Sequence, residues 1–100
     1  MGTKAERRAA RALVASYHEA RLAELVEHVV QALGRYRAGE IDVFEVDDTL
    51  HRYHKAAREL WKFCWGRGVG ANIELVARAL EEQAAGGQRI DWWAEAAPRR

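Results

Sequence analysis

Residues 40–65, EIDVFEVDDTLHRYHKAARELWKFCW, decide the fold that the sequence predicts. Apolar residues recur in this stretch every three or four positions, which is the spacing of one face of an α-helix. Asp42 is a suitable N-cap for such a helix, and Gly66 is a suitable C-cap. The pattern predicts a helix over residues 42–65, and its apolar stripe consists of Val43, Val46, Leu50, Tyr53, Ala57, Leu60 or Trp61, and Cys64.

A longer helix is predicted ahead of this stretch, over residues 4–37. The segment has no proline, and its only glycine is Gly34. Gly39 can take the left-handed conformation that ends a helix. Because the connection around Gly39 is short, we expect the two helices to run antiparallel as a hairpin. The stripe on the first helix consists of Val14, His18, Leu22, Leu25, Val29, Leu33 and Tyr36.

The remaining residues predict a third helix and a short tail. A helix over residues 72–85 would be capped by Asn72 and stopped by Gly86 and Gly87. The glycine-rich loop 66–72 before it lacks the Lys-Ser/Thr ending of a phosphate-binding loop, and no strand precedes it, so we expect a turn between helices. The tail predicts one helical turn over residues 91–97 that carries two tryptophans, which either fold back on the bundle or anchor a partner.

Together these elements predict an all-α fold in a single domain over residues 1–100. The architecture is an antiparallel helical hairpin with a shorter third helix and a short C-terminal turn. One hairpin exposes apolar surface on both sides. The four tryptophans of the chain and its long aliphatic stripes exceed what three helices would bury. We therefore expect a homodimer or higher homo-oligomer that completes a helical bundle. The interface is predicted to include Leu50, Tyr53, Trp61, Trp92 and Trp93.

Composition restricts the class of protein. With 49% hydrophobic and 31% charged residues, the chain is typical of a soluble globular domain. No apolar run approaches the roughly eighteen residues of a membrane span, and the N-terminus lacks the apolar region of a signal peptide, so we expect a cytoplasmic protein with no membrane partner. The lone Cys64 is predicted to act as a small hydrophobe.

Four polar residues share one flank of the second predicted helix. Asp47, His51 and His54 lie within two turns there, beside Arg58. A carboxylate and two imidazoles can bind zinc or iron, and an antiparallel hairpin would bring His28 and Glu24 to the same level. The alternative is a polar helix edge, or an interface whose assembly depends on pH because histidine titrates near neutrality.

The sequence supports three functions of different classes. We expect a non-catalytic helical interaction or assembly protein, because no carboxylate dyad or nucleophilic triad can be identified. The second hypothesis is a metal-binding bundle protein that uses Asp47, His51, His54, His28 and Glu24. The third is nucleic-acid binding through the basic start of the first helix, which a net charge of +1 does not favour. That basic patch consists of Lys4, Arg7, Arg8 and Arg11.

Overall fold

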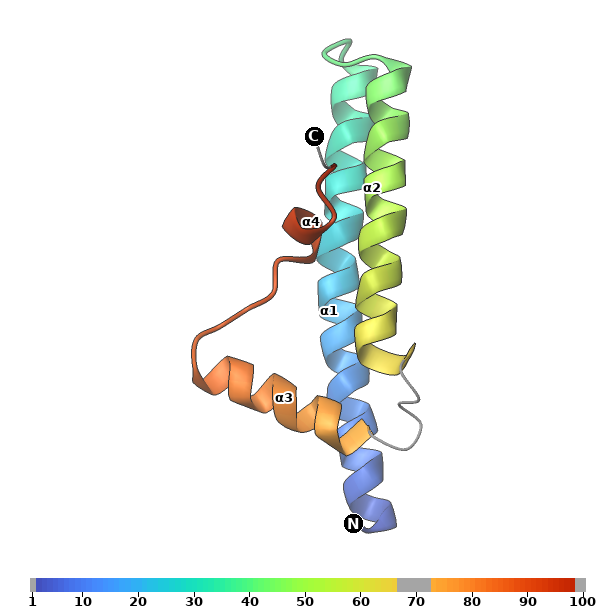
Figure 1. The fold of residues 1–100 in the computed structure, drawn as a ribbon. Helices are drawn as coiled ribbons and strands as arrows, with labels where there is room; N and C mark the ends of the chain where they lie inside the picture. Colours follow the sequence, from blue (N-terminus) through green and yellow to red (C-terminus); the bar gives the residue numbers. More distant parts are fainter. Residues whose placement is uncertain (1, 67–72, 99–100) are drawn as a thin grey trace.

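All regular secondary structure in the described part of the chain is helical. The computed structural model describes residues 2–66 and 73–98. Its elements are α1 (Lys4–Arg37), α2 (Val43–Trp61), the π-helical turn η1 (Lys62–Gly66), α3 (Ile73–Ala85) and α4 (Trp92–Glu95). The all-α prediction is therefore confirmed for these residues (Figure 1). None of the described helices is both long enough and apolar enough to cross a membrane.

Local sequence signals start both long helices. At the start of α1 the Thr3 hydroxyl accepts a hydrogen bond from the backbone amide of Glu6. The Glu6 carboxylate in turn accepts a hydrogen bond from the backbone amide of Thr3. The Thr3 amide also holds the pKa of Glu6 below its ordinary value. Asp42 and Glu45 form the same reciprocal capping box at the start of α2. Each box satisfies two backbone amides that a helix N-terminus leaves without an internal partner.

The turn between α1 and α2 places the two helices side by side. Gly39 has a φ of 78°, a left-handed conformation that only glycine adopts without strain. Beyond this turn α2 runs back along α1, and the N-terminal turns of α1 extend past the end of α2 (Figure 1). The result is an elongated molecule of 54 × 24 × 24 Å.

The second helical segment ends at Gly66, next to the predicted end at residue 65, but its last turn is π-helical. The α-helical pattern stops at Trp61 instead of continuing to residue 65, and η1 follows as one wider turn. Three consecutive side chains face inward in η1: Cys64 is fully buried, and Phe63 and Trp65 pack against the same core. The i→i+5 pattern of this turn has more residues per turn than an α-helix, which reduces the angle between successive side chains.

The third helix crosses the N-terminal half of α1 (Figure 1). Ile73, Ala77 and Leu80 are its buried residues, and they join Ala10 and Val14 of α1 in the hydrophobic core. The small side chains of Ala10 and Ala77 allow the two helices to approach closely. The predicted glycine-rich loop and the predicted cap Asn72 lie outside the described residues, apart from Gly66.

The predicted apolar stripes are wider than the core. Residues at their margins stay exposed although their spacing matches the helical period: Tyr36, Val43, Leu50, Trp61 and Ala84. Conversely, Ala56 of α2 is fully buried although it was not in the predicted stripe. The physical reason is that α3 and α4 pack on one side of the α1–α2 pair, so the margins of the stripes have no helix to pack against in the described part of the chain.

Candidate functional site

The tail is held on the helices mainly by one tryptophan. The Trp93 indole stacks on the His28 imidazole, with 4.1 Å between ring centroids and 5° between planes. The Arg52 guanidinium lies 4.3 Å from the centroid of the same indole. Arg52 also donates two hydrogen bonds to the Trp93 carbonyl, from Nε at 3.0 Å and Nη2 at 2.7 Å. Trp93 thus ties α4 to both α1 and α2.

The neighbouring tryptophan is anchored a few turns away. Trp92 donates its indole N–H to the Tyr17 hydroxyl at 2.8 Å, and its ring lies 5.3 Å from that of Phe63. Burial raises the pKa of Tyr17, and the hydrogen bond from Trp92 opposes this shift. The sequence left two alternatives for the tail tryptophans, folding back on the bundle or anchoring a partner. Both tryptophans contact their own chain, and neither projects outward.

An ion pair holds the segment that leads into α4. Glu24, a predicted metal ligand, pairs with Arg21 at 3.0 Å and also with Arg89. The hydrogen bond to Glu24 raises the pKa of Arg89. The Glu24 carboxylate therefore serves to connect α1 to the tail.

The other predicted metal ligands do not meet within one chain. His51 Nε2 lies 3.7 Å from Asp47 Oδ2, and these side chains are 74% and 64% exposed. His54 is exposed, and His28 is stacked on Trp93. Across residues 2–66 and 73–98, no three His, Cys, Asp or Glu side chains are grouped so that they could hold a metal ion. Zinc or iron binding by Asp47, His51 and His54 stays a prediction.

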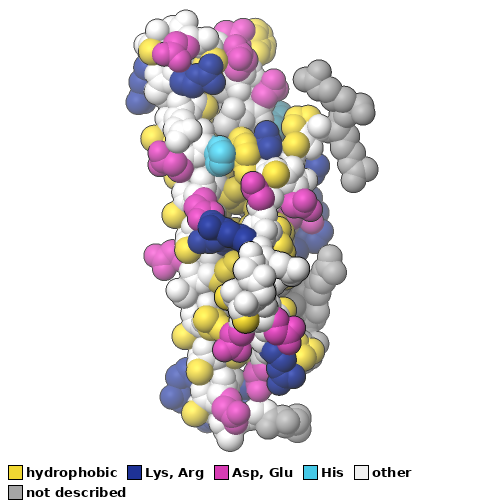
Figure 2. All heavy atoms as spheres, turned by 90° about the vertical axis from the view of Figure 1, so that its left-hand side faces the viewer, with side chains coloured by type: hydrophobic (Ala, Val, Ile, Leu, Met, Phe, Trp, Pro, Cys, Tyr) yellow, Lys and Arg dark blue, Asp and Glu magenta, His cyan; other side chains and the backbone are white. Residues whose placement is uncertain are grey.

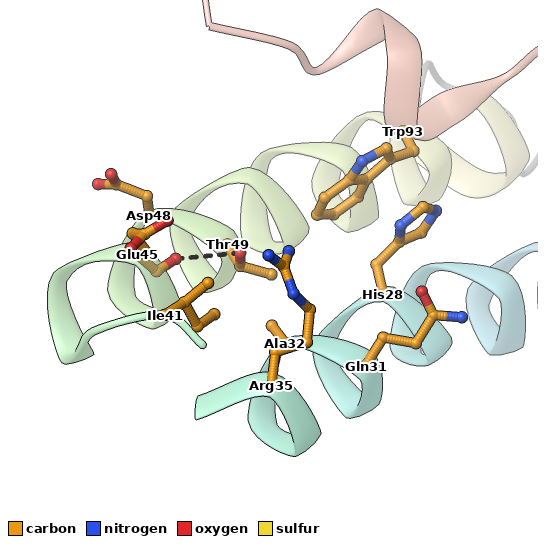
Figure 3. A pocket seen from close by; sticks show the side chains of 9 residues that line it. All are labelled: His28, Gln31, Ala32, Arg35, Ile41, Glu45, Asp48, Thr49 and Trp93. Carbon is orange, nitrogen blue, oxygen red and sulfur yellow. Dashed lines mark hydrogen bonds between the residues drawn. The ribbon is translucent and has the colours of Figure 1, made fainter. Parts of the chain in front are cut away.

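A groove lies beside Trp93, between α1 and the first turns of α2 (Figure 3). It is open and has a volume of about 350 Å³. Two of its polar side chains are bonded within the chain: Arg35 Nε donates to Glu40 at 3.3 Å, and the Thr49 hydroxyl donates to the Glu45 carbonyl at 3.1 Å. The lining consists of His28, Gln31, Ala32, Arg35, Ile41, Glu45, Asp48, Thr49 and Trp93.

The side of the α1–α2 pair that faces away from Trp93 carries apolar residues that no other element among residues 2–66 and 73–98 covers. Val26 and Val30 each stand two residues from His28, which is about 160° around the helix. On α2, Leu50 stands two residues from Arg52, while Val43 and Trp61 stand nine residues from it, so all three point about 160–180° away. We call this set the back face: Val26, Val30, Val43, Leu50 and Trp61, which are 42–56% exposed.

The opposite surface has a different character. Figure 2 shows the side that carries α3 and α4, where acidic and basic side chains are interspersed with apolar ones. Such mixing of both signs over a surface is typical of one that stays in contact with water. The back face, by contrast, concentrates half-exposed aliphatic and aromatic side chains along roughly 27 Å of helix.

The basic start of α1 remains exposed. Lys4, Arg7, Arg8 and Arg11 all lie on the surface, and Arg7 Nη1 donates to the Gly2 carbonyl at 3.0 Å. Glu6 lies among these residues and offsets part of their charge. Nucleic-acid binding through this patch stays a prediction.

Comparison with protein-family models, curated proteins and solved structures finds no match to this chain.

Sequence reasoning missed two parts of this arrangement. Val26 and Val30 were outside the predicted stripe, although they continue the three- and four-residue spacing that begins at Leu22. Arg52 was not singled out, and no local pattern marks a residue whose partner is 41 positions away. Of the predicted interface residues, Leu50 and Trp61 lie on the back face, Tyr53 packs against the core, and the two tail tryptophans contact their own chain.

Proposed function

We propose that this chain is a small non-catalytic assembly protein that works as a homo-oligomer, using the back face as its interface. The supporting observation is that five large apolar side chains on two adjacent helices are about half exposed and lie on one side. Completing the burial of each side chain would contribute on the order of 1 kcal/mol. A surface of this kind is typical of a protein–protein contact site.

The tail supports a structural role for the remaining elements. Arg52, His28 and Tyr17 hold α4 on the side away from the back face. With that side covered by the tail, the back face is the side of the α1–α2 pair that we assign to association. Two α-helices that present one apolar face form half of a four-helix bundle.

Light scattering tests this function directly. We expect the wild-type protein to have at least twice the 11.4 kDa mass of one chain at micromolar concentration. Leu50→Glu places a charge in the centre of the back face and should give a monomer with unchanged helix content. Leu75→Glu is the matched control, because Leu75 is similarly exposed on α3 and should leave the mass unchanged. A wild-type monomer at high concentration would contradict the proposal.

A further inference from the structure

Four exposed charged residues flank the back face. On α1, Glu19 stands seven residues before Val26 and Arg37 stands seven residues after Val30, and seven residues are two helical turns that return to nearly the same direction. On α2, Asp47 and Arg58 lie on the outer flank of the face. Each helix therefore carries one acidic and one basic residue beside its apolar residues. On α1 the two charges lie beyond Val26 and Val30, and on α2 they lie on either side of Leu50.

The two pairs of charges are centred at the same level of the molecule. Glu19 and Arg37 stand nine residues on either side of His28. Asp47 and Arg58 are centred between Arg52 and the residue after it. His28 and Arg52 are themselves level, because both lie against the indole of Trp93. A two-fold axis at that level, perpendicular to the helices, would interchange the acidic and basic position in both pairs.

Resting on the proposed function, we propose that the occupant of the back face is a second copy of this chain, packed antiparallel about that axis. Glu19 then faces the partner's Arg37, and Asp47 faces the partner's Arg58. The apolar side chains match in the same register, because Val26 meets the partner's Val30. Val43 and Trp61 each stand nine residues from Arg52, so Trp61 reaches the level of the partner's Val43. The product is a four-helix bundle made from two α1–α2 pairs.

The register distinguishes this arrangement from a parallel one. If the axis ran along the helices, α1 would face the partner's α2, and Glu19 would be offset from the partner's Arg58 by three residues. Arg37 would be offset from the partner's Asp47 by four residues, so the mismatches are about 5–6 Å. Exposed ion pairs contribute little affinity individually, so the apolar contact supplies the binding and the charges select the direction.

A cysteine near the axis tests the geometry. Residue 54 lies within two residues of the axis level and points away from Arg52, so His54→Cys should form a disulfide-linked dimer on mild oxidation. Phe44→Cys is the control, since it is exposed on the same helix but lies about 25 Å from its copy along the bundle. The native Cys64 is buried, so wild-type protein should give no cross-link.

Charge reversal provides an independent test by sedimentation. Asp47→Arg or Arg58→Asp alone should raise the dimer dissociation constant about tenfold, and the double variant should restore it. Rescue of Asp47→Arg by Arg37→Asp instead would support the parallel arrangement and overturn the antiparallel one. A dimer with neither rescue nor the residue-54 cross-link would also overturn this inference while leaving the proposed function intact. A wild-type monomer would overturn both.

Discussion

The indole of Trp93 lies parallel to the imidazole of His28, with the ring planes within 5° and the centroids 4.1 Å apart. This contact joins residues that are 65 positions apart in the sequence and fixes α4 on α1. Arg52 of α2 contacts both the ring and the carbonyl of Trp93, so Trp93 also fixes α4 on α2. Trp93 is therefore the residue of the tail that contacts both long helices, while Trp92 and Arg89 add contacts to Tyr17 and Glu24.

Replacing Trp93 should destabilise the fold as a whole. We expect Trp93→Ala to lower the free energy of unfolding by about 2–3 kcal/mol, since a half-buried aromatic side chain and its stacking partner are lost. Urea denaturation followed by circular dichroism measures this change. The Leu50→Glu background keeps association out of the measurement. Phe44→Ala is the control: its side chain is 75% exposed, and its change should stay within about 0.5 kcal/mol.

A double-mutant cycle isolates the stacking contact. His28→Ala and Trp93→Ala should together cost about 1 kcal/mol less than the sum of the single changes, because either one alone already removes the ring contact. Additive changes in the free energy of unfolding would show that the two rings contribute nothing to one another.

Arg52 should not be replaceable by lysine. Its Nε and Nη2 both donate to the Trp93 carbonyl, and an ammonium group cannot reproduce that planar geometry. We expect Arg52→Lys to speed amide hydrogen exchange in α4 about tenfold, and Arg52→Ala to speed it at least as much. Arg58→Lys, an exposed site on the same helix, provides the control. Unchanged exchange in Arg52→Lys would show that charge alone holds the tail.

The parts of the fold that could be predicted from sequence are those that local chemistry determines. The Asp42 cap, the turn at Gly39 and the start of α1 depend on residues within a few positions of one another, and the sequence reveals them. The end of α2 could not be predicted, because the wider turn is selected by simultaneous burial around Cys64. The spacing of apolar residues along the sequence does not show which side chains tertiary packing will bury.

The candidate surface was predictable only in part for a related reason. Spacing placed Leu50 and Trp61 on the apolar stripe, but spacing cannot say which half of a stripe another helix covers. That depends on where α4 packs, and hence on contacts such as Trp93 with His28. The proposed metal ligands illustrate the same limit, since Glu24 pairs with Arg89, a residue distant in sequence.

Replacing Gly34 or Gly39 by alanine should change the free energy of unfolding in opposite directions. Gly34 is inside α1, and an added methyl group there would meet nothing within 4 Å, so Gly34→Ala should raise the free energy of unfolding by about 1 kcal/mol. Gly39 has a positive φ, so Gly39→Ala should lower it by about 1–2 kcal/mol. Thermal denaturation of both variants in the Leu50→Glu background provides the comparison. Equal effects would contradict the left-handed turn at Gly39.

The buried thiol of Cys64 should make stability fall in alkaline solution. Burial raises the pKa of Cys64 from 9.0 to about 11. The unfolded chain therefore releases this proton at lower pH than the folded chain does. The neutral thiol's contribution is complete below pH 9 and is lost as the pH rises towards 11, by about 2–3 kcal/mol in total. Cys64→Ala removes the pH-dependent contribution of the thiol but keeps that of Tyr17. The free energy of unfolding of the wild type should therefore fall more steeply with pH than that of the variant. Parallel pH profiles from urea denaturation would show that the thiol is not desolvated.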